Sequence, residues 1–382
     1  MFTFVHRMSP NNIKLNTIES ALLDIRLGKV LIVVDNEDRE NEGDFICAAE
    51  CITPEIINFM ATHGRGLICA PIDEQRANEL NLDLMVSSNT AYHETAFTVS
   101  VDLIGHGCTT GISAHDRATC IKALTDPESK ASDFARPGHI FPLRAKTGGV
   151  LRRNGHTEAA VDLAKLAGLY PAGVLVEILN QDGSMARLPE LLEIAKLHQL
   201  KIITIQDLVA YRLKTERLVE KIFEKEIQTP SGDFRAIVYR QANGDEHLAI
   251  VKGYFNAEEI VPVRVHSSSE SGDIYSVLFR GYAREIEKTM EFIQKQGKGV
   301  FLNLFHGEKK LTLLETLMYQ EKPKTVTADY NENQRDIGVG AQILKDLGIH
   351  KIRLITSQPK RRVGLKAFDL EIVDHIDPET LL

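Results

Sequence analysis

The segment NEDRENEGD at residues 36–44 is the first in the chain with residue types suited to chemistry. Five of its nine residues are acidic, and Arg39 lies among them. Carboxylate oxygens favour magnesium or manganese, ions that often take only one or two protein ligands. Carboxylates held close together also repel, so one of them can keep a raised pKa and act as an acid or base. The segment indicates a divalent-metal site with proton-transfer groups, against the alternative of a solvated acidic turn.

A second candidate site lies within residues 137–183. His156 and Thr157 open the helical pattern TEAAVDLAKL, and Thr157 is expected to be its N-cap. The free amides and partial positive charge of a helix N-terminus, together with Arg153, suit a phosphate group. The alternative is that Arg152 and Arg153 simply face solvent.

Three further polar residues stand in apolar or turn-like sequence. Glu177 lies inside VLVEIL, where a buried carboxylate needs partners, although strand alternation could also turn it to water. His139 follows a Pro-Gly turn in PGHIFP, and a structural role is the alternative to a catalytic one. Thr110 belongs to a polar cluster that precedes a predicted helix.

An alternation of strands and helices must position these residues. The predicted strands are 29–35, 45–50, 66–72, 95–103, 174–179 and 201–205. The predicted helices are 115–124, 157–169 and 189–200, and a further helical pattern runs from 206 to about 227. The turn signal TPSGD after this pattern predicts a domain boundary within 210–230. An Asn-Gly pair between apolar segments predicts a hairpin in FRAIVYRQANGDEHLAIV.

Length and composition limit the possible classes of protein. The 382 residues predict two domains, and the net charge of −8 argues against a general nucleic-acid-binding protein. No apolar run approaches the roughly 20 residues of a membrane span, and no signal peptide is recognised at the N-terminus. The five widely spaced cysteines do not suggest a disulfide framework, so a cytoplasmic setting is expected.

Five motifs, in the same order, resemble 3,4-dihydroxy-2-butanone 4-phosphate synthase of riboflavin biosynthesis over about residues 14–212. They are DNEDRENEGDF, HGRGLIC, TTGISAHDRA, RPGHIFPLRAKTGGVLRRNGHTEAAVDLAKLAG and VLVEILNQDGSMAR. The resemblance implies an α+β fold with a mixed sheet and conversion of ribulose 5-phosphate to 3,4-dihydroxy-2-butanone 4-phosphate and formate. It further implies magnesium or manganese, with up to two ions in a site, and a homodimer that shares its active site.

The resemblance also assigns roles to single residues. Glu40 and His156 match the family's metal ligands. His139 and Glu177 match residues essential for catalysis, and Glu42 and Cys69 match positions that assist acid–base steps. The positions that match substrate-binding residues are Arg39, Glu40, Asp44, Thr110, Arg153, Asn154, Gly155, His156 and Thr157.

The second half, over roughly 225–375, resembles GTP cyclohydrolase II but lacks that family's zinc ligands. Ser269, Arg280 and Tyr282 stand where the family has three cysteines, and no cysteine follows Cys120. A serine hydroxyl is a poor zinc ligand and an arginine cannot be one, so no zinc and no GTP ring opening are expected. The expected domains are therefore a synthase at 1–212, a helical linker at 213–227 and a catalytically inactive cyclohydrolase II-like domain at 228–382.

The same half drifts at other family positions and leaves two alternatives. Phe301 replaces a glycine, and Asn333 replaces an aspartate while Arg335 is kept. One alternative is a bifunctional enzyme with an unrecognised metal site, to which His266 and His306 could contribute. The other is that the basic stretch 351–366 binds a nucleotide or RNA, although a solvated charged turn is the favoured explanation.

Overall fold

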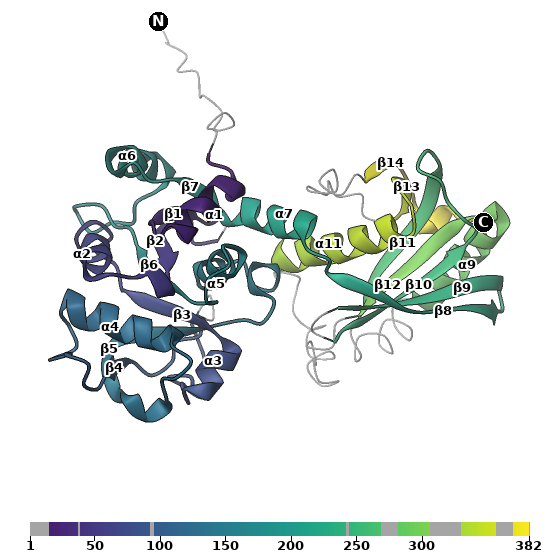
Figure 1. Ribbon diagram of the computed structural model, residues 1–382. Coiled ribbons are helices and arrows are strands. Elements are labelled where there is room, and N and C mark those ends of the chain that lie inside the picture. Colours follow the sequence, from purple (N-terminus) through teal and green to yellow (C-terminus); the bar gives the residue numbers. More distant parts are fainter. Residues whose placement is uncertain are drawn as a thin grey trace, which may run out of the picture. The chain divides into compact units, whose positions relative to one another are not determined.

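The computed structural model describes residues 15–36, 39–91, 95–241, 244–268, 282–305, 330–356 and 370–381. The chain forms two compact units, Met1–Tyr211 and Arg212–Leu382, and the described residues of each contain a seven-stranded mixed sheet (Figure 1). The expected α+β class is therefore confirmed. Ser269, Arg280 and His306 lie outside the described residues, as do Glu37 and Asp38 of the acidic segment.

The sheet of the first unit has the strand order β4-β5-β3-β6-β2-β1-β7. Its strands are β1 (Leu31–Val34), β2 (Gly43–Ala48), β3 (Cys69–Asp73), β4 (Val101–Leu103), β5 (Phe134–Ala145), β6 (Gly173–Glu177) and β7 (Ile202–Thr204). Strands β1 and β2 are fully buried, and they join in an antiparallel hairpin whose tip is the acidic segment. Burial of the strands fixes the two ends of that tip.

Helices and short 3-10 turns connect these strands. They are α1 (Ile18–Arg26), η1 (Ala49–Cys51), α2 (Pro54–His63), α3 (Glu74–Glu79), α4 (Ala114–Thr125), η2 (Ala131–Asp133), η3 (Gly149–Leu151), α5 (His156–Leu166), α6 (Leu188–His198) and α7 (Ile205–Thr215). Helix α5 packs against β2, β3, β5 and β6, and residues 156–164 of this helix are all buried. The central helix thus brings its N-terminal residues to the sheet.

The strand register places the candidate residues in one row across the sheet. Val33 pairs with Asp44, and Asp44 pairs with Glu177 on β6. On the other side of β6, Cys69 of β3 pairs with Phe141 of β5. His139 lies two residues before Phe141, and the register places it at the level of Glu177. Residues far apart in sequence therefore lie in the same row across the sheet.

Three sequence expectations need correction in this unit. The predicted N-cap Thr157 lies inside α5, whose N-cap is Gly155, because the backbone already turns helical at His156. His139 lies within the long strand β5 rather than in a loop, since pairing with β3 and β4 extends the strand past the Pro-Gly pair. The strand predicted at 95–103 is regular only from Val101.

The second unit has the strand order β14-β13-β11-β12-β10-β9-β8. Its elements are β8 (Val219–Thr229), β9 (Gly232–Gln241), β10 (Glu246–Lys252), β11 (Ile260–Ser268), α9 (Tyr282–Gln296), β12 (Gly299–Phe305), α11 (Tyr330–Asp346), β13 (Lys351–Ile355), β14 (Glu371–Ile376) and η6 (Pro378–Thr380). The predicted hairpin is confirmed, because β9 and β10 are antiparallel neighbours. Phe301 is buried within β12.

The helical linker predicted for 213–227 is wrong beyond Thr215. Helix α7 ends at Thr215, and residues 219–229 form strand β8, which pairs with β9 along its whole length. The segment is rich in Glu and Lys, which favour a helix locally, but pairing with a distant strand overrides that weak preference.

None of the helices that the structure describes is long and apolar enough to cross a membrane.

Gly138 allows β4 and β5 to approach closely, because an added Cβ would overlap the backbone of Val101 and Asp102. We expect Gly138→Ala to lower the free energy of unfolding by about 1–3 kcal/mol, as overpacking does. Thermal unfolding of the full chain should then show a drop of roughly 2–4 °C for each kcal/mol.

Gly340→Ala is the matched control, because a Cβ there meets only ordinary contacts with Leu302 and Leu304. That helical exchange should be neutral or slightly stabilising. An unchanged melting temperature for Gly138→Ala would contradict the close approach of the two strands.

Candidate active site

Asp35 organises the tip of the β1–β2 hairpin. Its carboxylate accepts hydrogen bonds from the main-chain amides of Glu40 (3.2 Å) and Glu42 (2.9 Å) and from the Arg39 guanidinium (2.9 Å). The side chain of Asp35 is only 1% exposed. A buried carboxylate with three donors is a stable centre for a turn, so Asp35 fixes where the acidic side chains project.

His156 reaches this hairpin from the first turn of α5. Its Nε2 lies 3.0 Å from the carbonyl oxygen of Val33, an acceptor that requires Nε2 to carry the proton. Its Nδ1 therefore keeps a lone pair, and this atom lies 3.9 Å from both Glu40 Oε2 and Asp44 Oδ2. Burial lowers the pKa of His156 despite the neighbouring carboxylates, which favours the neutral imidazole that ligates metals.

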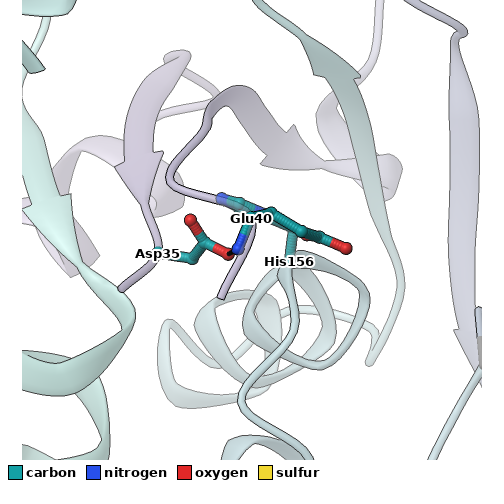
Figure 2. A group of neighbouring side chains, drawn as sticks. All are labelled: Asp35, Glu40 and His156. Carbon is teal, nitrogen blue, oxygen red and sulfur yellow. Dashed lines mark hydrogen bonds and ion pairs between the residues drawn. The ribbon is translucent and has the colours of Figure 1, made fainter. Parts of the chain in front are cut away.

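Asp35, Glu40 and His156 form a candidate cation site. One ligand atom from each residue lies within 4.8 Å of the other two. Figure 2 shows the three side chains converging from the hairpin tip and from the start of α5. The donor set fits a divalent cation, because two carboxylates supply charge and the orientation of His156 presents its lone pair.

Two arginines stabilise the hairpin tip around this cluster. Arg39 Nη1 contacts the carboxylates of both Asp35 and Glu40. Arg187, from the segment before α6, donates to the main-chain carbonyls of Glu40 (2.8 Å) and Asn41. Because these bonds engage the backbone, Arg187 holds Glu40 in place without neutralising its carboxylate directly.

The remaining acids of the cluster are held in a desolvated and negatively charged setting. Burial raises the pKa of Asp44 well above its usual range, and Glu177 and Glu42 raise it further. Asp44 Oδ1 has no hydrogen-bond partner in the described part of the chain. Burial and Glu40 also raise the pKa of Glu42, and Arg187 partly offsets this effect. Both residues are therefore suited to holding or moving a proton at a higher pH than an ordinary carboxyl group.

Glu177 and Cys69 continue the cluster along the sheet. The Glu177 carboxylate accepts a hydrogen bond from the amide of Leu67 at 2.8 Å, and Gly66 leaves room for it. Burial raises the pKa of the Cys69 thiol, with further contributions from Glu177 and Asp44. Cys69 is thus a neutral thiol, which can donate a hydrogen bond but does not attack as a thiolate.

The segment before α5 is tied to the helix by two buried carboxylates. Glu158 accepts from the amide of Lys146 at 3.0 Å and pairs with the Arg153 guanidinium at 2.6 Å. Asp162 accepts from the amide of Val150 at 2.7 Å. These bonds position Arg153, Asn154 and Gly155 at the N-terminus of the helix, where an anion is favoured.

His139 and Thr110 lie at the other end of the row, beside β4. His139 is hydrogen-bonded to Asp102 rather than to the Glu40 cluster. Thr110 is exposed, and its neighbours Thr109 and Gly111 donate to the buried carboxylate of Asp116. The described contacts of one chain therefore bring together Arg39, Glu40, Glu42, Asp44, Cys69, His156 and Glu177. They leave His139 and Thr110 outside this cluster, and Thr157 is buried in the first turn of α5.

Several residues that shape the site were not selected from the sequence. Asp35 and Arg187 lie within the quoted motifs, but their partners are backbone atoms that no residue pattern reveals. Glu158 and Asp162 did carry a signal, because two acids one helical turn apart stand on an otherwise apolar helix. Asp102 alternates with apolar residues in its strand and looked like an ordinary surface position.

The mixed sheet, the buried carboxylates and the neutral imidazole define an acid–base enzyme of the α+β class with a candidate cation site. Residues 19–211 match the family described as 3,4-dihydroxy-2-butanone 4-phosphate synthase, and residues 220–377 match GTP cyclohydrolase II. The chain belongs to the 3,4-dihydroxy-2-butanone 4-phosphate synthase family and is therefore a lyase of riboflavin biosynthesis.

Curated relatives extend over both segments. Riboflavin biosynthesis protein RibBA of Cytophaga hutchinsonii is 56% identical over 376 residues, 96% of this chain and 93% of the relative. The protein of that name from Aquifex aeolicus is 49% identical over 374 residues, 95% of this chain and 92% of the relative. These relatives match this chain over both family segments and carry a single protein name. They give no support to the expectation that the C-terminal segment is degenerate.

Two solved structures are similar. RibBX of A. baumannii, described as a two-domain 3,4-dihydroxy-2-butanone 4-phosphate synthase, is 42% identical with a TM-score of 0.77, and the match covers 95% of this chain and 99% of that chain. A synthase in complex with two magnesium ions is 43% identical with a TM-score of 0.51, and the match covers 52% of this chain and 98% of that chain.

The raised pKa of Asp44 predicts a pH-dependent effect on stability. At a pH between the usual aspartate pKa near 3.9 and the raised pKa, Asp44 keeps its proton in the folded chain and loses it in the unfolded chain. The contribution of Asp44 to stability is therefore fully present below the usual pKa and is lost as the pH rises through the raised pKa. With a chelator present to remove metal ions, Asp44→Asn should increase the free energy of unfolding by about 1–3 kcal/mol at pH 8 and by less at pH 4.

Thermal unfolding at the two pH values measures this difference. Asp83→Asn is the control, because Asp83 is exposed and lies outside the cluster. If Asp44→Asn increased the free energy of unfolding equally at both pH values, or lowered it at pH 8, repulsion among the carboxylates would be excluded as the cause.

Proposed function

We propose that this chain converts D-ribulose 5-phosphate to 3,4-dihydroxy-2-butanone 4-phosphate and formate with the help of a divalent cation. The observation that carries the proposal is the cluster of Asp35, Glu40 and His156, in which the imidazole presents its lone pair to the carboxylates. Magnesium or manganese suits these ligands, and the related synthase with two magnesium ions supports up to two ions.

Glu40 and His156 would hold the cation, with Asp35 close enough to contribute. When bound, the ion would polarise substrate oxygens and stabilise the negative charge of an enediolate. Arg39 and Asp44 lie beside these ligands and would orient the hydroxyl groups of the sugar.

The substrate phosphate would bind at the N-terminus of α5. Arg153, Asn154, Gly155, His156 and Thr157 form this region, where the helix dipole and the Arg153 guanidinium favour an anion. Glu158 would compete with the phosphate for Arg153, which favours a doubly charged phosphate over weaker anions.

Several protons must move at different carbons, and the chain supplies groups of different character for them. Glu42 and Asp44 have raised pKa values and can deliver or hold a proton. Cys69 is a neutral thiol, Glu177 is a carboxylate at the same level of the sheet, and His139 is an exposed imidazole. This spread of acids and bases suits an enolisation followed by skeletal rearrangement.

The same proposal includes a homodimer with a shared active site, in the cytoplasm. His139 and Thr110 belong to the site by family resemblance, yet their contacts in one chain run to β4 and its loop. Apolar side chains at the two ends of this loop and in residues 84–86 are about half exposed, a pattern typical of a covered surface. They are Leu84, Met85, Val86, Ile104 and Ile112.

The C-terminal domain is proposed to lack GTP cyclohydrolase II activity. No cysteine follows Cys120, and the matched zinc positions hold Ser269, Arg280 and Tyr282, so a thiolate zinc site cannot form there. A bifunctional enzyme remains the second candidate, since the GTP cyclohydrolase II family matches residues 220–377. His266 on β11 is the described histidine that this candidate would need.

Glu40→Gln and His156→Asn are expected to lower formate release from ribulose 5-phosphate at least about a hundredfold, because each removes a charge or lone pair from the cation site. Added magnesium should raise the melting temperature of the parent chain and should do so much less for either variant. A coupled formate assay and thermal unfolding measure the two effects.

Glu193→Gln is the control, because Glu193 is an exposed residue of α6. Full activity of Glu40→Gln with an unchanged magnesium response would sink the assignment of the cation site.

The second expectation concerns GTP. The full chain, supplied with zinc and GTP, should form no pyrimidine product above the rate without protein, because the cysteine thiolates are missing. Chromatography of the nucleotide mixture measures this, with an active GTP cyclohydrolase II as the positive control. Clear turnover would establish the bifunctional candidate instead.

A further inference from the structure

Four main-chain groups at the tip of the β1–β2 hairpin are hydrogen-bonded within the hairpin itself. Asp35 accepts from the amides of Glu40 and Glu42, and the amide of Asp35 donates to the Glu42 carbonyl at 3.2 Å. The amide of Asn41 donates to the carbonyl of Asn36 at 3.2 Å. These bonds leave the carbonyls of Glu40 and Asn41 to a partner from another element.

Arg187 is that partner. Both carbonyls accept from Arg187 Nη1, the one of Glu40 at 2.8 Å. Arg187 lies 147 positions from Glu40 in sequence, immediately before α6. Every main-chain donor and acceptor of residues 40–42 therefore has a partner, and Arg187 supplies two of the six hydrogen bonds.

These two bonds lie where the backbone of the tip is least favourable. Asn41 has a φ of +54°, in the left-handed region that asparagine enters more readily than most residues. Such a conformation costs free energy and persists only where the surrounding contacts support it. Arg187 binds the carbonyl on each side of the Asn41 Cα, so it stabilises the turn at the strained residue.

Arginine is an unusual residue for position 187. Arg187 is the N-cap of α6, where short side chains such as Ser, Thr, Asp and Asn are preferred because they bond the first amides of the helix. Here the carboxylate of Glu190 accepts from the Arg187 amide at 3.0 Å, which fixes the Arg187 backbone. The side chain contacts the hairpin tip instead of the helix cap.

Helix α6 supports the hairpin at a second point. Gly43 lies against Leu191 of α6, and a Cβ at residue 43 would overlap the Leu191 side chain. Leu191 is fully buried. The start of α6 therefore contacts the returning arm of the hairpin through one polar and one apolar side chain.

We propose that Arg187 is a positioning residue, which keeps the hairpin tip in the conformation that directs the Glu40 carboxylate towards His156. Glu40 Oε2 lies 3.9 Å from His156 Nδ1 in this conformation. Glu42 is repelled by Glu40 and attracted by Arg187, so loss of the guanidinium would favour opening of the tip. The inference rests on the proposed function, because it takes Glu40 as a ligand of the cation.

A positioning role and a merely structural role predict different results. A structural arginine would change stability by the same amount at every magnesium concentration. A positioning arginine changes the equilibrium between a tip that can bind the cation and a tip that cannot. Excess cation then restores the competent state, because it binds that state alone.

The test is Arg187→Met in the full chain, which keeps an apolar stem and removes the donor. We expect the magnesium concentration for half-maximal formate release to rise about 10–100-fold, the usual effect of losing a residue that supports a metal ligand. At saturating magnesium, kcat should stay within about threefold of the parent value. Arg187→Lys keeps a charged donor and should recover part of the magnesium affinity.

Hydrogen exchange, followed by mass spectrometry of peptides that contain residues 40–42, gives a readout independent of turnover. With a chelator present, these amides should exchange slowly in the parent chain and fast in Arg187→Met. Added magnesium should slow the exchange in the variant. Arg26→Met is the matched control, because Arg26 also donates to a distant main-chain carbonyl, that of Ala167 at 2.9 Å. It should change neither the exchange at 40–42 nor the magnesium requirement.

Two results would overturn the inference. The first is an Arg187→Met chain whose half-maximal magnesium concentration lies within about threefold of the parent value. The second is equally fast exchange at residues 40–42 in parent and variant with a chelator present. If Arg187→Met does not fold, Arg187→Gln takes its place in both measurements. If the parent chain releases no formate, the proposed function fails, and hydrogen exchange still decides whether Arg187 orders the tip.

Discussion

The hydrogen bond from His156 Nε2 to the Val33 carbonyl is the interaction on which the site depends. It joins the first turn of α5 to the last part of β1, and so it brings a helix N-terminus against the acidic hairpin tip. It also decides which ring nitrogen carries the proton, and hence that Nδ1 faces Glu40 and Asp44. A rotation of this ring would turn the Nδ1 lone pair away from the two carboxylates. It would also leave the buried Nε2 donor without its acceptor.

The cluster around this bond is a local source of instability. Asp35, Glu40, Glu42, Asp44 and Glu177 interact electrostatically in a partly or fully desolvated region, and the pKa of Asp44 is raised as a result. Arg39 and Arg187 compensate for part of this charge, one at the carboxylates and the other at the backbone. The surrounding apolar strands and the buried helix α5 make such a cluster tolerable, because they hold its members where repulsion alone would separate them.

The two halves of the chain use their sheets in different ways. In the first unit a single row of paired strands carries side chains that can hold a cation, donate protons and accept them. In the second unit, the described core keeps the packing of a folded domain, including buried Tyr239 with its hydrogen bond to Asp346. The basic residues at the start of 351–366 are paired, Lys351 with Glu258 and Arg353 with Asp374, which agrees with a solvated charged surface.

The sequence alone determined which elements form and which residues are chemically unusual. The apolar strands, the α5 pattern and the Asn-Gly hairpin were readable because they rest on local periodicity and turn preference. The carboxylates of residues 36–44 stood out because they cluster between two apolar strands, and His156 because it lies at the start of a helix. Glu177 stood out because a carboxylate within an apolar strand is costly to bury. Only the tertiary structure decided that Asp35 anchors the hairpin, that Arg187 donates to the Glu40 backbone and that Asp102 is hydrogen-bonded to His139. It also decided that 219–229 is a strand, against its local helical preference. These outcomes depend on contacts between residues far apart in the chain, and strand register and ring orientation are properties of the assembled sheet.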